Sequence, residues 1–403
     1  MAKQQGTTLT VTAAQAAAFR LARHRLSART DHGPRTKDGP GTKNGPGTRP
    51  QVPSPTIEDI CRATGGIQAQ VMSAAEMSIW TRRRETTRAE VGAALFERRE
   101  IVKTSAMRLT LHLIPASDLA MVISALRPAS MAVVERWQER VGARPDHARA
   151  LVDTIMDGLR DGPRTQQELI GLARKKAGKS MRAWLDNSWG ALRAPVVDGL
   201  IVYGPPRGSA TTFVRVDQWL PRQPSFEVDE ARAELCRRFL SAFGPATAHD
   251  FAKWSGLKTS EARVVITGLA GELESVTIEG ASGWIRDLDR RTLDESVLDE
   301  ESIRLLGPFD SFLLAHATKE HLVPPKHYKR VYRPQGWISP VVMRGGSIIG
   351  VWFPETSSQT VTLGVELFSK TTPGLRQAIE REAEALGRFL GLRGQARFGS
   401  VAK

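Results

Sequence analysis

Two glutamines separated by one residue stand out as side chains that could hold a reacting water molecule. They are Gln68 and Gln70, in the segment Gly65–Gln70 (GGIQAQ). Side chains at positions i and i+2 share a face only where the backbone is extended, and the two glycines make such a segment feasible before a helix that begins near Val71. An amide offers a carbonyl acceptor and two N–H donors, so the pair could orient water without being a strong base. On its own the pair is a weak signal, because most glutamines are solvated surface residues.

Conventional catalytic motifs are absent from the sequence. It contains no HExxH zinc motif, no GxSxG nucleophile elbow, no Walker A loop, and no GxGxxG fingerprint placed between a strand and a helix. The eight histidines are scattered, and no pair combines metal-ligand spacing with a nearby second carboxylate. We therefore predict neither a metal nor an organic cofactor.

The charge of the chain predicts a polyanionic partner. Among 403 residues, 57 Lys and Arg against 43 Asp and Glu give a net charge of +14. The basic residues cluster: residues 20–50 carry eight Lys or Arg and two Asp, and Arg82, Arg83 and Arg84 are consecutive. Such clusters favour nucleic acid, because each phosphate contact releases a condensed counterion. Frequent arginine in GC-rich genomes explains part of the excess, and the aromatic platforms typical of RNA-binding proteins are not evident.

The remaining composition is that of an ordinary globular protein. Hydrophobic residues make up 41% of the chain, and no apolar run approaches the roughly 20 residues of a membrane helix. The N-terminus has no apolar signal-peptide segment. Two distant cysteines, Cys61 and Cys236, exclude a cysteine-based zinc ribbon. We expect a monomer in the cytoplasm, associated with the nucleoid, without a membrane partner.

An internal repeat predicts the kind of structural unit from which the chain is built. Gly162–Leu169 (GPRTQQEL) matches Gly244–Phe251 (GPATAHDF), and each copy places Thr three residues before an acid, as in a helix-starting capping box. Each copy follows an amphipathic helix and precedes a second helical stretch and a β-rich segment. This is the order of a winged helix-turn-helix. The amphipathic helices are expected at 148–160 and 229–243, and the β-rich segments at 200–216 and 274–287.

A third copy of this pattern contains the glutamine pair. Thr87 is expected to cap a helix that ends near Arg98, followed by a strand-like stretch at 101–114. Upstream, a helix at about 12–27 and another beginning near Thr56 flank a Gly- and Pro-rich basic stretch, residues 30–50, which reads as a disordered loop. We favour a tolerated surface insertion for this loop over a basic arm that touches DNA.

The C-terminal part changes to a β-rich pattern. Residues 331–356 alternate around Arg344–Ser347 (RGGS), which predicts a hairpin with a Gly-Gly turn, and a further strand and a closing helix follow. The expected fold class is α+β, with three tandem winged helix-turn-helix units followed by a small C-terminal β-barrel or sheet domain. The expected domains are 1–128, 129–222, 223–300 and 301–403.

Beyond the repeats, the chain resembles the AlkZ/YcaQ-like DNA glycosylases, a superfamily of winged helix DNA-binding proteins. The GIQAQ segment, the Ala-rich helix that follows it and the strand Met107–Leu113 (MRLTLHL) carry the N-terminal resemblance. Leu306–Leu314 (LGPFDSFLL) and Arg333–Pro340 (RPQGWISP) are similar to two C-terminal family segments. The resemblance covers about residues 8–395 without the 30–50 insertion. One departure is Leu109, where the family often has Gly.

The resemblance implies a C-shaped stack of winged helices, with Gln68 and Gln70 as a catalytic QxQ pair in the concave face. Members of the QxQ subgroup are associated with self-resistance to natural products that alkylate or crosslink guanine N7. The implied partner is double-stranded DNA with an alkylated guanine. A guanine alkylated at N7 is cationic and leaves without protonation, so a positioned water would suffice for hydrolysis. The candidate DNA-backbone contacts are Arg82, Arg83, Arg84, Arg108, Lys329, Arg330 and Arg333.

Two non-enzymatic readings compete with this hypothesis. A transcriptional regulator built from tandem winged helices explains the charge and the repeats but gives Gln68 and Gln70 no task. A scaffold that uses winged helices for protein contacts fits the charge least well. Within the enzymatic reading, Asp310 is the rival catalytic carboxylate, although we expect it to cap or to form an ion pair within the C-terminal unit.

Overall fold

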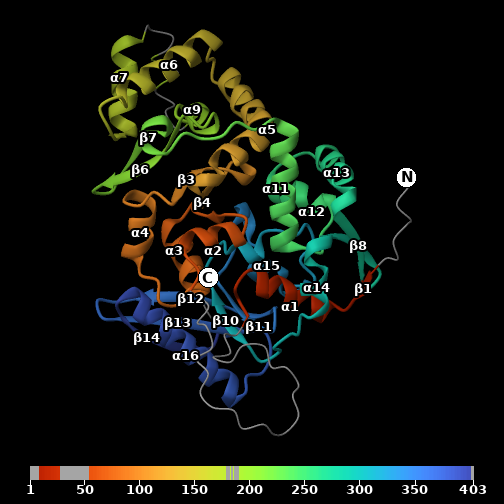
Figure 1. Ribbon diagram of the computed structural model, residues 1–403. Helices are drawn as coiled ribbons and strands as arrows, with labels where there is room; N and C mark the ends of the chain where they lie inside the picture. The colour runs from red at the N-terminus through yellow and green to blue at the C-terminus, as the bar shows by residue number, and fades with distance from the viewer. Residues whose placement is uncertain (1–8, 28–53, 178–181, 183–184, 186–189, 401–403) are drawn as a thin grey trace, which may run out of the picture.

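A computed structural model describes residues 9–27, 54–177, 182, 185 and 190–400. The predicted 30–50 loop lies outside the described residues. The protein is a mixed α and β structure. Three units, each made of helices and a β-hairpin, lie next to one another above a C-terminal sheet (Figure 1). The first unit lies at the left centre, the second forms the upper lobe, the third lies on the right, and the C-terminal sheet with its helix lies at the bottom.

The three units repeat one order of elements, a helix, two further helices and a two-stranded hairpin, and in the first two units a short strand follows the first helix. This order is typical of a winged helix. The first unit comprises α2 (Ile57–Ala63), β2 (Ile67–Gln68), α3 (Met72–Arg82), α4 (Arg88–Phe96), β3 (Ile101–Ser105) and β4 (Leu111–Pro115). The second comprises α6 (Pro145–Gly158), β5 (Arg164–Thr165), α7 (Gln166–Lys176), α9 (Arg193–Val197), β6 (Ile201–Arg207), β7 (Ala210–Arg215) and α10 (Val216–Trp219). The third comprises α11 (Val228–Phe243), α12 (Ala248–Ser255), α13 (Thr259–Gly268), β8 (Leu273–Ile278), β9 (Ala281–Arg286) and α14 (Arg290–Asp294).

The helix starts predicted from the Thr-acid pattern are confirmed. Thr87, Thr165 and Thr247 cap α4, α7 and α12, and in each case the acid three residues later closes the capping box by accepting from the threonine backbone N–H. These bonds satisfy amide groups that have no partner within the helix. Thr56 caps α2 in the same way.

The units are joined more closely than the predicted boundaries suggest. β3 pairs with β6, so the first two units share one six-stranded sheet in the order β2-β4-β3-β6-β7-β5. The helix α5 (Leu119–Arg140) runs without a break across the boundary predicted at 128/129. The N-terminal elements β1 (Leu9–Val11) and α1 (Ala13–Arg23) were expected in the first unit, but β1 pairs in parallel with β8 of the third.

The long helix α5 belongs to the core. Together with the preceding 3-10 turn it spans Ala116–Arg140, and among the described residues this is the one helical segment long and apolar enough to cross a membrane by length and composition. Its apolar residues Leu119, Val122 and Leu126 are buried in a cluster that also contains Phe239 of α11. The apolar face of α5 that carries these residues is therefore packed against the third unit. Cys61 and Cys236 are both buried and unpaired.

The C-terminal unit is a five-stranded sheet covered by a helix. Its strands are β10 (Ile303–Leu306), β11 (Val341–Arg344), β12 (Ser347–Thr356), β13 (Thr360–Leu367) and β14 (Arg393–Phe398), paired in that order. The predicted Gly-Gly hairpin is confirmed, because Arg344 pairs with Ser347 and both intervening glycines have positive φ. The closing helix is α16 (Pro373–Leu390), and α15 (Tyr328–Val331) lies between β10 and β11 in the chain. The strand β14, which pairs in parallel with β13, was not predicted.

Candidate active site

The first catalytic candidate, Gln68, lies in a short strand held between two parts of the fold. β2 runs antiparallel to β4, with Gln68 opposite His112. Gly65 and Gly66 lead into this strand with φ of 64° and 99°, a region that favours glycine. A Cβ on Gly65 would lie 2.8 Å from the ring of Trp254 in the third unit, so the two glycines also allow close packing. The extended conformation predicted for the segment is therefore present, and Gln68 is 9% exposed.

Arg108 holds the Gln68 side chain in place. Its Nη2 donates to Oε1 of Gln68 at 3.3 Å, and its Nη1 donates to the carbonyl oxygen of Trp254. Because a guanidinium only donates, the atom that faces it must be the carbonyl oxygen of the glutamine. No carboxylate of the described residues lies within ion-pair distance of Arg108, and burial lowers its pKa to about 10. A half-buried cation without an ion-pair partner among the described residues thus lies beside Gln68.

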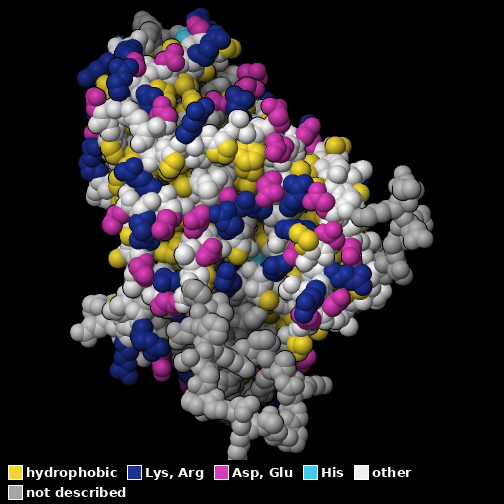
Figure 2. Space-filling view, in the orientation of Figure 1, with side chains coloured by type: hydrophobic (Ala, Val, Ile, Leu, Met, Phe, Trp, Pro, Cys, Tyr) yellow, Lys and Arg dark blue, Asp and Glu magenta, His cyan; other side chains and the backbone are white. Residues whose placement is uncertain are grey.

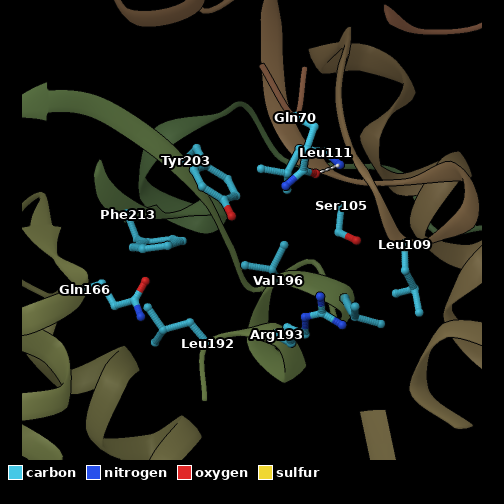
Figure 3. A pocket seen from close by; sticks show the side chains of 11 residues that line it. Gln70, Ser105, Leu109, Leu111, Gln166, Leu192, Arg193, Val196, Tyr203 and Phe213 are labelled. Carbon is cyan, nitrogen blue, oxygen red and sulfur yellow. Dashed lines mark hydrogen bonds between the residues drawn. The ribbon is translucent and has the colours of Figure 1, made fainter. Parts of the chain in front are cut away.

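The second candidate, Gln70, faces solvent. The backbone N–H of Leu111 donates to Oε1 of Gln70 at 3.3 Å, and Figure 3 shows the side chain beside a cavity opposite Tyr203. The two glutamines therefore come from one extended segment but differ in setting: Gln68 is buried and clamped, and Gln70 is exposed. Each carbonyl oxygen accepts one bond from the protein, which leaves its second lone pair and both amide N–H groups for water and sugar.

Two further ionisable groups, His112 opposite Gln68 and Lys319 within electrostatic range of Arg108, were not singled out from the sequence. His112 is 2% exposed, and burial together with the nearby Arg108 lowers its pKa to about 3, so it is neutral. The sequence signal that could have found His112 is its place in the strand-like stretch 101–114, where alternate side chains point to the same face. Lys319 is 9% exposed, and burial lowers its pKa to about 8. The charge of Asp250 opposes this lowering of the pKa, and the charge of Arg108 adds to it. Lys319 lies in an irregular segment between β10 and β11, for which no sequence pattern gave a signal.

The structure corrects the prediction that Arg82 contacts DNA. Its side chain is 0% exposed and forms two bonds of 2.8 Å with the carboxylate of Asp310, whose side chain is also 0% exposed. Ser78 Oγ donates to the same carboxylate at 2.9 Å and the backbone N–H of Phe312 donates at 3.0 Å. Because the Arg82 side chain is fully buried in this pair, it has no access to DNA. The pair instead ties α3 to the C-terminal unit.

Asp310 caps the turn Ser311–Leu313 within the C-terminal unit, as expected, but its ion pair is with Arg82 of the first unit and not within its own unit. Burial alone would raise the pKa of Asp310, but the charge and hydrogen bonds of Arg82, with those of Phe312 and Ser78, hold this pKa below its usual value. The carboxylate is therefore ionised and fully engaged. A general base needs a free lone pair within reach of the reacting water, which Asp310 does not offer.

The other predicted DNA contacts fall into two groups. Three are engaged within the chain: Arg83 with Glu90, Arg84 with Glu382, and Arg330 with Glu366. Arg84 also lies over the ring of Trp80, 4.2 Å from its centroid. By contrast, Lys329 is exposed and Arg333 is half-buried. Figure 2 shows basic and acidic side chains intermixed over much of one face, with dark blue side chains gathered over the second unit at the upper left.

The described residues contain no group of three or more His, Cys, Asp or Glu side chains arranged to hold a metal ion. What the structure brings together is Gln68, Gln70 and Arg108, by pairing β2 with β4 and by the turn between β3 and β4. These are neutral amides next to a cation. Such a set can orient a water molecule and stabilise a nearby anion, but it contains no strong base and no nucleophile.

Comparison with known proteins places the chain in a family. The family model described as DNA glycosylase AlkZ-like matches residues 61–389. The chain belongs to the AlkZ-like DNA glycosylases. It is therefore an enzyme of DNA repair, and the purely regulatory alternative is not favoured.

Two comparisons with Streptomyces sahachiroi support this membership. A protein described as an interstrand DNA cross-link repair glycosylase is 31% identical over 349 residues, which cover 84% of this chain and 92% of that protein. The solved structure of the DNA glycosylase AlkZ matches with a TM-score of 0.80 and 28% identity, covering 97% of this chain and all of that chain. The similarity thus extends over the described units and includes the segment that carries Gln68 and Gln70.

Proposed function

We propose that this AlkZ-like glycosylase hydrolyses the N-glycosidic bond of cationic N7-alkylguanines in double-stranded DNA, including bulky adducts and interstrand crosslinks. In this proposal Gln68 and Gln70 hold the attacking water, and the enzyme is monofunctional. The observation that carries it is the clamp of Arg108 on Gln68, which fixes one of two neighbouring amides in a site without a strong base. The description of the S. sahachiroi relative supports crosslinks as substrates.

The chemistry of the substrate explains why amides suffice. Alkylation at N7 makes guanine a cation, so the base departs as a neutral molecule and needs no proton. The transition state resembles an oxocarbenium ion, and the remaining task is to hold water close to C1′. The free lone pairs of Gln68 and Gln70 accept from that water, and their amide N–H groups donate to the sugar. Neutral side chains also avoid repulsion with the DNA phosphates.

DNA binding is supported by charge in two places. The chain carries a net charge of +14, and we propose that its three units are winged helices that bind the duplex. At the site, Arg108 is a half-buried, partly desolvated cation without an ion-pair partner among the described residues. Partial desolvation of an unpaired charge is unfavourable, and a DNA phosphate would offset that penalty. We further propose that the enzyme acts as a cytoplasmic monomer.

Base release from a defined duplex tests this function. With a single N7-alkylguanine in one labelled strand, we expect enzyme-dependent abasic sites, seen as strand scission after alkali treatment. With a crosslinked duplex, we expect the two strands to separate on a denaturing gel. Tight, sequence-selective binding without any base release would instead support the regulator.

A further inference from the structure

A cavity of about 190 Å³ adjoins Gln70 where the first and second units meet. Gln70 and Ser105 line it from the first unit, and Val196, Tyr203 and Phe213 line it from the second (Figure 3). The pairing of β3 with β6 in the shared sheet holds the two walls together. The cavity is therefore a fixed part of the fold beside a proposed catalytic residue.

One wall of this cavity is apolar, whereas the polar side chains of Gln70, Ser105, Gln166 and Arg193 line other parts of it. Leu192 and Val196 contribute aliphatic surface, and the rings of Tyr203 and Phe213 lie 4.9 Å apart at an interplanar angle of 47°. Such walls favour an apolar or aromatic group, which gains burial and ring contacts.

Leu109 forms a further wall of the cavity at a conformational cost. Its φ is 57°, in the left-handed region that favours glycine. For an L-residue this conformation costs about 1–2 kcal/mol. Its side chain lines the cavity and packs against the small cluster of Val134, Ala194 and Val197. A strained residue kept beside a proposed catalytic site indicates that its side chain serves the site.

We propose that this cavity holds the apolar or aromatic substituent carried on N7 of the damaged guanine and so selects bulky adducts over small ones. This inference rests on the proposed function and adds the kind of N7 substituent that the same site would accept. A cavity of about 150 Å³ accommodates benzene, so the volume here suits one aromatic ring with a short link to the purine. The substituent is then held beside Gln70, where it positions C1′ relative to the water.

The test compares two duplexes that differ only in the N7 substituent, benzyl or methyl. The readout is the ratio of the single-turnover rates of base release, benzyl over methyl. Ser105→Phe places a ring in the cavity, and we expect the ratio to fall by about tenfold or more, since the benzyl group is excluded. Leu109→Gly relaxes the backbone and removes a wall, and we expect the ratio to fall by about threefold. Ser275→Phe, at a half-buried strand serine in β8, is the matched control and keeps the wild-type ratio.

The outcomes separate this inference from the proposed function. If the wild type releases both bases but neither cavity variant changes the ratio, the cavity proposal is wrong and the glycosylase proposal stands. If the wild type releases neither base, both are wrong. Should Ser105→Phe fail to fold, Leu109→Gly decides alone: an unchanged ratio overturns the proposal, and a lowered ratio supports it.

Discussion

Replacing Gln70 by alanine is expected to slow N7-alkylguanine release by about 100-fold or more under single-turnover conditions, a range typical of groups that act on the attacking water. The folded protein should be nearly unaffected. Gln70 is exposed, and its one hydrogen bond to the described residues is that from the Leu111 backbone. Thermal unfolding should therefore shift by only a degree or two, about the effect of an ordinary surface substitution. Gln359→Ala, at an exposed glutamine next to β13, is the matched control.

The same change at Gln68 should separate the two residues. Gln68→Ala is also expected to slow base release, but it removes an acceptor of the half-buried Arg108 guanidinium. Leaving such a donor unsatisfied costs about 1–3 kcal/mol, so the stability of this variant falls as well. A Gln70→Ala variant that keeps the wild-type rate would remove Gln70 from the mechanism, whatever Gln68→Ala does.

Asp310→Asn is expected to destabilise the protein by about 3–5 kcal/mol, because it leaves the buried Arg82 guanidinium without its charge partner. The measurement is the shift of the chemical unfolding transition. Glu355→Gln, which breaks the exposed pair with Arg397, is the control and should cost less than about 1 kcal/mol. Since the folded-state pKa of Asp310 lies below its usual value, the stabilisation is present above the unfolded-state pKa and is lost as the pH falls through the folded one.

This variant also decides the role of Asp310 in the reaction. At a temperature where Asp310→Asn is folded, we expect base release at a rate close to that of the wild type, since the carboxylate does not reach the site. Wild-type stability combined with abolished base release would make Asp310 the catalyst.

The features predicted well from the sequence are those set by neighbouring residues. The capping boxes at Thr87, Thr165 and Thr247 need only a threonine and an acid three residues apart, so they are visible without the fold. The hairpin at Gly345 and Gly346 and the extended segment of the glutamine pair are similarly local. Each of these was predicted with its residues and approximate bounds.

The features missed depend on contacts between distant parts of the chain. The sequence of Arg82, Arg83 and Arg84 predicts a solvated basic cluster. In the structure α3 packs against β10, and Arg82 pairs with the carboxylate of Asp310, 228 positions away. The parallel pairing of β1 with β8 and of β13 with β14 also joins segments that no local pattern connects. Desolvation by distant parts of the chain, as at Arg108 and Lys319, is likewise not visible in local residue spacing.

The pH dependence of base release tests the central claim, a site of neutral amides, most directly. Between about pH 5 and 7.5 the amides of Gln68 and Gln70 do not titrate, and the pKa values of about 3 for His112, about 8 for Lys319 and about 10 for Arg108 lie outside this range. We therefore predict a single-turnover rate on N7-methylguanine that is constant within about twofold over this range. A rate that rises about tenfold per pH unit to a plateau within it would reveal a titrating general base and contradict this account.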